Sequence, residues 1–185
     1  MYLTLHFILS HLVADYPTQS SKLVKYKYKS FLGILLHTFI HLAIILILVF
    51  PFMHLYRVCI GAVIIFATHL FIDYSKITIE KKYPKINKFL IYVSDQAAHM
   101  IVILLLAIFI GRVEPSFSGE WVKFYLNQDL IDFLIILTLV TYFWDITRWT
   151  YLNSKKPIPY KRDYMMMARN ALIVIIAFGV YWLIK

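Results

Sequence analysis

The sequence contains the uninterrupted apolar run Ile101-Val-Ile-Leu-Leu-Leu-Ala-Ile-Phe-Ile110 and, earlier in the chain, the run Ala43-Ile-Ile-Leu-Ile-Leu-Val-Phe50. In a strand of a membrane β-barrel, apolar residues alternate with polar ones, and neither run alternates. Apolar stretches recur along the chain at lengths of about 20 residues, which is the length that a helix needs to cross a bilayer. In lipid, every backbone polar group must be satisfied within a helix or a closed barrel. The runs therefore predict transmembrane α-helices.

The overall composition excludes a soluble globular domain. Hydrophobic residues make up 61% of the 185 positions and charged residues 16%, whereas soluble domains contain about 45–50% and about 25% of these classes. The single cysteine, Cys59, excludes an intrachain disulfide and a zinc site built from several cysteines. A metal site in this chain would therefore have to use His, Asp and Glu as ligands.

We predict an all-α, polytopic membrane protein in which residues 1–185 form a single domain, a bundle of six transmembrane helices. The expected helices cover residues 1–16, 31–53, 57–75, 88–111, 129–149 and 167–184. The first is short, about 24 Å at 1.5 Å per residue, and Pro17 is expected to close it. It is shorter than the hydrocarbon core of a bilayer, which is about 30 Å thick.

The basic residues predict how the bundle is oriented. Short cytoplasmic loops carry an excess of Lys and Arg, and 15 of the 19 basic residues lie in three alternate segments, 17–30, 76–88 and 148–169. We expect these segments in the cytoplasm and both termini outside. The net charge of +9 then reflects topology and attraction to anionic lipid headgroups, and it does not indicate nucleic acid as a partner.

Ionisable residues are costly inside a bilayer and usually mark function, and here they come in pairs. Each of the first four expected helices carries two such residues at the spacing i, i+4, which places both side chains on one helix face. The pairs are His11 and Asp15, His37 and His41, His69 and Asp73, and Asp95 and His99. Because successive helices run in opposite directions, all four pairs are expected in the cytoplasmic half.

These pairs are the residue types that a metal site inside a helix bundle requires. Bundle cores hold such sites by projecting His and carboxylate side chains inward, and these ligands suit zinc, manganese or iron more than calcium. We expect the eight residues to bind a divalent metal, zinc ahead of manganese and iron, with Asp15, Asp73 and Asp95 as candidate catalytic groups. The alternative for each pair is a hydrogen-bonded contact between helices without any metal.

Further polar residues are expected to border this site or to bind its substrate: Gln19, Lys76, Gln96, Asp145 and Arg148. Asp145 and Arg148 close the fifth expected helix on the side where the four pairs lie. Lys76 has two interpretations, because a lysine at a membrane surface either binds an anionic group such as phosphate or extends to the lipid headgroups.

The same motifs resemble a bacterial integral membrane family catalogued as domain of unknown function 3307. The resemblance is carried by His11-Leu-Val-Ala-Asp15-Tyr-Pro-Thr-Gln19, by His37 and His41, by His69-Leu-Phe-Ile-Asp73-Tyr-Ser-Lys76, and by Asp95-Gln96 and His99. It implies a multi-pass protein of the bacterial inner membrane and nearly nothing about activity. A looser similarity, in the His–Asp pattern on membrane helices, links the chain to inner-membrane metal-dependent hydrolases, and it implies a reaction class by analogy only.

Three functions fit these observations. The leading hypothesis is a membrane-embedded metal-dependent hydrolase that acts on a lipid or phosphate ester at the cytoplasmic leaflet. The second is an ion- or proton-coupled carrier or channel, and the third is a non-catalytic scaffold subunit in which the pairs join helices. A permeation path needs polar groups through the outer half as well, and that half consists mostly of Ile, Leu, Val and Phe.

The predicted orientation can be tested by labelling single cysteines in intact cells, on a background that lacks Cys59. An impermeant thiol reagent should modify Ser118→Cys, which lies in an external segment, and should not modify Lys82→Cys, which lies in a cytoplasmic one. Labelling at position 82 without labelling at position 118 would show that the bundle is inverted.

Overall fold

The computed structural model of the protein describes residues 2–185, and these residues form helices and no strand. The helices are α1 (Tyr2–Asp15), α2 (Ser21–Lys29), α3 (Phe31–Val49), α4 (Tyr56–Lys82), α5 (Lys88–Ile110), α6 (Glu120–Tyr125), α7 (Gln128–Thr138), α8 (Trp144–Lys155) and α9 (Tyr164–Ile184). A 3-10 turn, η1 (Phe50–Phe52), follows α3, and a π-helical turn, η2 (Leu139–Phe143), joins α7 to α8. The expected all-α class is confirmed.

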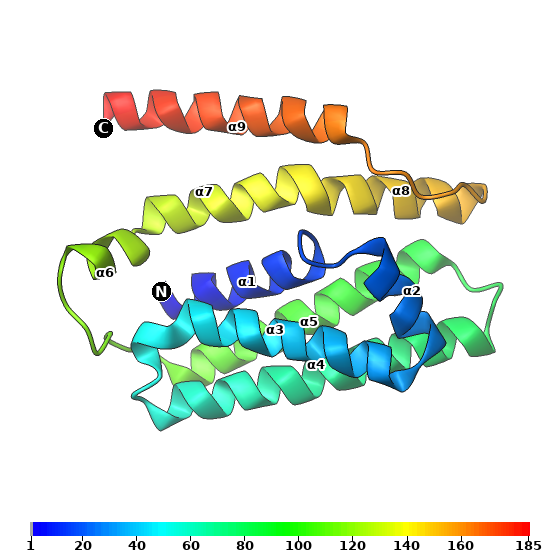
Figure 1. Cartoon of the computed structure of the whole chain (residues 1–185), viewed down its shortest axis with the longest axis horizontal. Helices are drawn as coiled ribbons and strands as arrows, with labels where there is room; N and C mark the ends of the chain where they lie inside the picture. Colours follow the sequence, from blue (N-terminus) through cyan, green and yellow to red (C-terminus); the bar gives the residue numbers. More distant parts are fainter. Residues whose placement is uncertain (1) are drawn as a thin grey trace.

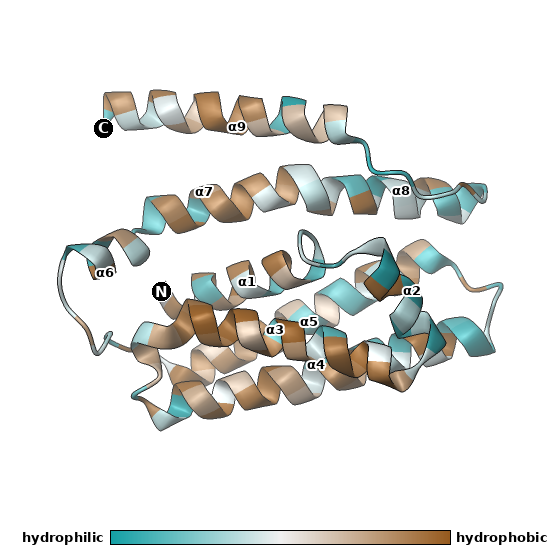
Figure 2. Ribbon diagram, in the orientation of Figure 1, coloured by the Kyte–Doolittle hydropathy of each residue, from teal (hydrophilic) through white to brown (hydrophobic). Residues whose placement is uncertain are grey.

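Five segments are long and apolar enough to cross a membrane. They are Phe31–Phe52, Tyr56–Lys82, Lys88–Ile110, Glu120–Lys155 and Tyr164–Ile184. Each corresponds to one of the expected spans, and many of their large apolar side chains are exposed on the outside of the bundle. Figure 2 shows apolar residues along the middle of α3, α4, α5 and α9, and hydrophilic residues gathered in α2, α8 and the connections. The protein is therefore a membrane helix bundle.

The first expected span is a shorter apolar helix, and it lies in the centre of the bundle (Figure 1). α1 has 14 residues, a length of about 21 Å, and it packs against α3, α5 and α7. None of residues 3–15 is exposed. The short helix is thus enclosed by longer helices. It ends before Pro17 as predicted, and Met1 of the expected range lies outside the described residues.

Three expected boundaries were wrong. The helix expected over 57–75 continues to Lys82, the one expected over 129–149 continues to Lys155, and the expected loop 17–30 contains α2. Ser20 starts α2 by accepting a hydrogen bond from the backbone N–H of Leu23. Hydropathy marks only the part of a helix that lies in hydrocarbon, whereas the backbone stays helical among charged residues at the membrane surface. Charged extensions and short polar helices therefore escape a search for apolar spans.

The three basic segments gather at one end of the bundle (Figure 1). α2, the connection from α4 to α5 and the connection from α8 to α9 lie at this end, and the connection from α3 to α4, α6 and the end of α9 lie at the opposite one. We call the first of these the basic end. Its location in the cytoplasm stays a prediction.

The interior between α1, α3, α4 and α5 is mostly apolar at the end opposite the basic end, and the buried ring of His6 packs there against Phe52. There, the first turns of α1 and α4 pack against the last turns of α3 and α5, with Phe7, Val49, Phe52, Val58 and Ile110 fully buried. The paired polar residues lie beyond this apolar half, toward the basic end. Asp95, for example, follows the first residue of α5 by seven positions, about 10 Å along the helix.

α2 contacts α3 closely at Gly33. A Cβ atom added to Gly33 would lie 2.3 Å from both the carbonyl carbon and the carbonyl oxygen of Tyr26. Ser30 ends α2 and starts α3, and its Oγ accepts a hydrogen bond from the Gly33 N–H. Because the neighbouring atoms are backbone, the contact leaves no room for a side chain. It also fixes the position of Lys27, one residue after Tyr26.

Substitution of Gly33 tests this packing. We expect Gly33→Ala to destabilise the protein by about 1–3 kcal/mol, because α2 must move away from α3 to admit the methyl group. Gly179→Ala is the matched control, since no atom lies within 4 Å of its added Cβ and alanine favours a helix over glycine. Thermal unfolding in detergent measures both variants. Equal melting temperatures for the two would show that α2 does not pack on Gly33.

Candidate metal centre

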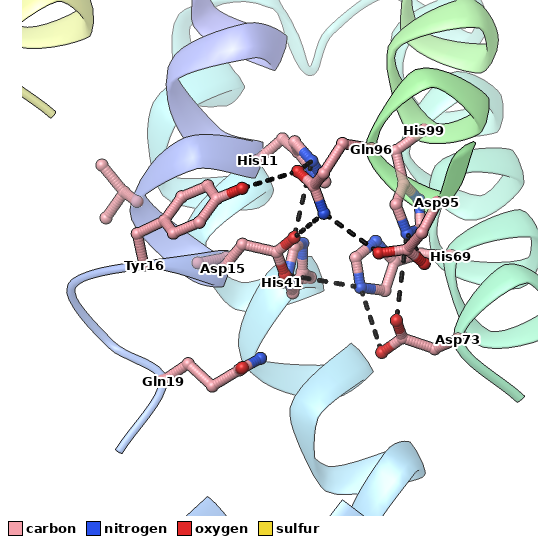
Figure 3. A network of polar contacts seen from close by, with 12 residues as sticks. His11, Asp15, Tyr16, Gln19, His41, His69, Asp73, Asp95, Gln96 and His99 are labelled. Carbon is pink, nitrogen blue, oxygen red and sulfur yellow. Dashed lines mark hydrogen bonds and ion pairs between the residues drawn. The ribbon is translucent and has the colours of Figure 1, made fainter. Parts of the chain in front are cut away.

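The structure brings all four i, i+4 pairs together between α1, α3, α4 and α5. His11 and Asp15 come from α1, His37 and His41 from α3, His69 and Asp73 from α4, and Asp95 and His99 from α5. All eight residues are buried, and none is more than 9% exposed. Figure 3 labels seven of these residues, all but His37, and shows them turned toward one another, with His69 between Asp15 and Asp73. The pairs are not divided among separate helix contacts.

Four donor atoms from three helices form the largest group. Asp15 Oδ1 lies 2.9 Å from His41 Nε2 and 3.1 Å from His37 Nε2. His69 Nε2 lies 3.3 Å from His37 Nε2 and 4.0 Å from Asp15 Oδ1. An ion bound tetrahedrally at about 2.0–2.2 Å separates its ligand atoms by roughly 3.3–3.6 Å. The observed separations bracket this range, so small side-chain movements suffice to place all four atoms around one ion.

The three imidazoles of this group compete for hydrogen bonds to one carboxylate oxygen. Three Nε2 atoms face a single carboxylate oxygen, Asp15 Oδ1, and two of them face each other. Two N–H groups can donate to that oxygen, while a third nitrogen nearby must accept or stay unpaired. Within the described residues, the second ring nitrogens of His41 and His69, both Nδ1, have no hydrogen-bond partner. An ion at the centre would accept a lone pair from each of the four donor atoms, so the group fits a metal.

Two further groups adjoin the first. His11, His69 and His99 form one, and Asp73, Asp95 and His99 form the other. The rings of His69 and His99 stack with their centroids 4.2 Å apart. His99 Nε2 lies 3.6 Å from Asp95 Oδ1 and 3.9 Å from Asp73 Oδ1. His69 and His99 therefore connect the three groups into one polar cluster.

Lysines already occupy the two carboxylates at the edge of the cluster. Lys27 Nζ lies 2.6 Å from Asp73 Oδ2, and Lys76 Nζ lies 2.9 Å from Asp95 Oδ2. Asp15 has no lysine partner among the described ion pairs. If all the imidazoles are neutral, the three carboxylates and two ammonium groups leave one net negative charge, and Asp15 is the carboxylate that no ammonium group contacts. A cation is therefore favoured in the group of Asp15, His37, His41 and His69, which we call the Asp15 group.

Amide and hydroxyl groups orient the carboxylates. Gln96 Nε2 donates to Asp15 Oδ2 at 3.2 Å and to Asp95 Oδ2 at 3.1 Å. Its Oε1 accepts from the Tyr16 hydroxyl at 2.8 Å (Figure 3). Gln19 Nε2 lies 3.2 Å from His37 Nε2. Of the residues expected around the site, Gln19, Lys76 and Gln96 contact it.

Among the described contacts, Asp145 and Arg148 bond to the connection between α8 and α9 and not to the cluster, and their expected role toward a substrate stays a prediction. Asp145 accepts hydrogen bonds from the Tyr160 hydroxyl at 2.8 Å and from the backbone N–H of Asp163 at 3.3 Å. Arg148 Nη1 lies 3.4 Å from Asp163 Oδ2. Burial and the Asp145 carboxylate both raise the pKa of Tyr160, which keeps its hydroxyl a donor. The two residues hold the connection between α8 and α9, because the polar face of α8 points toward that connection.

Three residues of the site were missed from the sequence. Lys27 was counted only as a topology signal, because α2 was not expected. Tyr16 and Tyr92 share a hydrogen bond of 3.0 Å between their hydroxyls, and Tyr92 also bonds to the hydroxyl of Thr147 at 2.8 Å. Tyr92 precedes Asp95 by three residues and therefore lies on the same helix face. This spacing is the sequence signal that could have revealed Tyr92.

Comparison with known proteins identifies the part of the chain that carries the cluster. A family model described as "Protein of unknown function (DUF3307)" matches residues 3–123, a range that contains α2–α5, nearly all of α1 and every member of the cluster. α7, α8 and α9 follow the matched region. Neither the curated proteins nor the solved structures include a match to the chain. Because the match covers well over half of the residues, this chain belongs to the family of unknown function DUF3307.

Proposed function

We propose that this protein is a membrane metalloprotein that binds one divalent ion through Asp15, His37, His41 and His69. The observation that carries the proposal is the set of four buried donor atoms, all within 4.8 Å of one another. Three imidazoles and one carboxylate suit zinc best, since it accepts this ligand set in tetrahedral geometry. Manganese and iron accept the same ligand types with more positions filled.

The charge of the interior supports the same site. An unpaired carboxylate inside a membrane bundle is costly, and such groups pair with a cation or with one another. Lysines neutralise Asp73 and Asp95. Among the described ion pairs, Asp15 has histidine partners and no lysine or arginine partner. A divalent ion held by Asp15 would supply this positive charge.

We further propose that the protein is a hydrolase of a lipid or phosphate ester in the bacterial inner membrane, acting at the cytoplasmic leaflet. Water or a substrate oxygen would have to enter as a fifth ligand beside the four protein ligands, and the ion would then polarise that oxygen or lower the pKa of the water. His99 Nε2 is buried without a hydrogen-bond partner within the described residues and lies 3.6 Å from Asp95 Oδ1. This pair is suited to take up a proton.

The alternative of a carrier or channel has less support. Phe7, Val49, Phe52, Val58 and Ile110 fill the half of the bundle opposite the basic end. Polar groups that would line a path for ions are concentrated in the other half. These apolar side chains would separate an ion in the Asp15 group from the end opposite the basic end. A site of this kind opens toward one leaflet only.

Elemental analysis of the detergent-purified protein tests the metal proposal. We expect about one zinc ion per chain after purification without chelator, and at least about a tenfold loss in His41→Gln, because even changes beyond the ligands cost tenfold or more in affinity. His54→Ala is the control. His54 is exposed and lies in the connection from α3 to α4, at the end of the bundle opposite the basic end. A wild-type protein that neither contains nor takes up zinc, manganese or iron would refute the proposal.

A second comparison tests which group holds the ion. Asp15→Asn should abolish metal binding, because an amide is a poor ligand and the negative charge is lost. Asp95→Asn should leave the metal content unchanged, because the ion pair of Asp95 is made with Lys76. Isothermal titration with zinc measures both variants. The reverse pattern would move the ion to the group of Asp73, Asp95 and His99.

A further inference from the structure

A groove of about 510 Å³ lies beside the cluster, between the corner of α2 and α3 and the last turns of α4. Four lysines and two aromatic residues line it: Lys27, Lys29, Phe31, Tyr74, Lys81 and Lys82. The elements that line it, the corner of α2 and α3 and the last turns of α4, lie at the basic end of the bundle (Figure 1). We call it the basic groove.

Three lysines of the basic groove have no acidic partner. Lys29, Lys81 and Lys82 are exposed, and none of them belongs to an ion pair in the part of the chain that the structure describes. The acidic residue next to them in sequence, Glu80, accepts a hydrogen bond from the Tyr28 hydroxyl and does not line the groove. The groove therefore offers a ligand three lysines that make no ion pair among the described residues.

The rim of the groove is apolar. Phe31 is 52% exposed and Tyr74 is 49% exposed, and their rings pack edge to face with centroids 6.1 Å apart. Aromatic rings at this level of a spanning helix lie at the boundary between headgroups and hydrocarbon. A ligand that fits both parts carries an anionic head and an apolar tail.

Lys27 connects the groove with the cluster. It lines the groove, and its Nζ lies 2.6 Å from Asp73 Oδ2. We infer that the basic groove binds an anionic phospholipid, whose headgroup phosphate lies among the lysines and whose chains lie along Phe31 and Tyr74. The further step, that this lipid is a substrate, rests on the proposed function, whereas the binding itself does not.

The experiment measures lipid binding by the full chain in zwitterionic detergent, with fluorescently labelled phosphatidylglycerol as the probe. The triple variant Lys29→Ala, Lys81→Ala, Lys82→Ala should bind it about tenfold more weakly or worse, given the contribution of each basic residue near an anionic lipid. The control is the triple variant Lys22→Ala, Lys85→Ala, Lys88→Ala, which removes as many charges near the same end and none from the groove. It should bind within about twofold of the wild type.

Two outcomes would overturn the inference. Equal weakening in both triple variants would mean that surface charge attracts the lipid without a built groove. Displacement of the probe by inorganic phosphate as readily as by unlabelled phosphatidylglycerol would mean that the groove binds free phosphate.

Zinc content is measured on the same preparations. Groove-dependent lipid binding by a metal-free wild type would refute only the proposed function, and groove-independent binding by a zinc-loaded protein would refute only the basic groove.

Discussion

The contact of one buried carboxylate with three imidazoles is the constraint on which the rest of the bundle depends. Asp15 Oδ1 meets His37 and His41 of α3 and approaches His69 of α4, so the central helix α1 is tied to its neighbours through polar atoms. Such a group is tolerated inside a membrane only where partners surround it, which requires α1 to be enclosed. The enclosure in turn explains how a helix of 14 residues is kept in the bundle without spanning the hydrocarbon by itself.

The interior of the bundle has a mostly apolar half and a polar half. Apolar side chains of α1, α3, α4 and α5 close one half, and the polar cluster with its lysines occupies the half toward the basic end. Lys27 and Lys76 stabilise Asp73 and Asp95, which were expected as metal ligands and are here partners of ammonium groups. The eight paired residues fall into three groups that could each hold an ion, and the proposed function places the ion in the Asp15 group. Lys27 also joins the cluster to the basic groove, so a site that binds a cation and a surface that binds an anion share this residue.

Much of this could be predicted from the sequence because two periodic signals are strong in a membrane. Apolar stretches gave the helix class, and the i, i+4 spacing placed each pair, such as His69 and Asp73, on one face. The alternation of basic segments then placed all pairs at one depth. The sequence did not reveal Lys27, because α2 is a short polar helix that is positioned by its contact with Gly33. It also did not reveal that Asp145 bonds to Tyr160 and Asp163, because the polarity of a helix face does not tell which neighbour the face meets.

The coordination shell of the bound metal tests the central claim most directly. X-ray absorption at the zinc edge, measured on the zinc-loaded protein, reports the number and type of ligand atoms. The Asp15 group predicts three imidazole nitrogens and an oxygen at about 2.0–2.2 Å, with one imidazole fewer in His41→Gln. A shell with a single imidazole and mainly oxygen ligands, or one that does not change in His41→Gln, would contradict the assignment of the ion to Asp15, His37, His41 and His69.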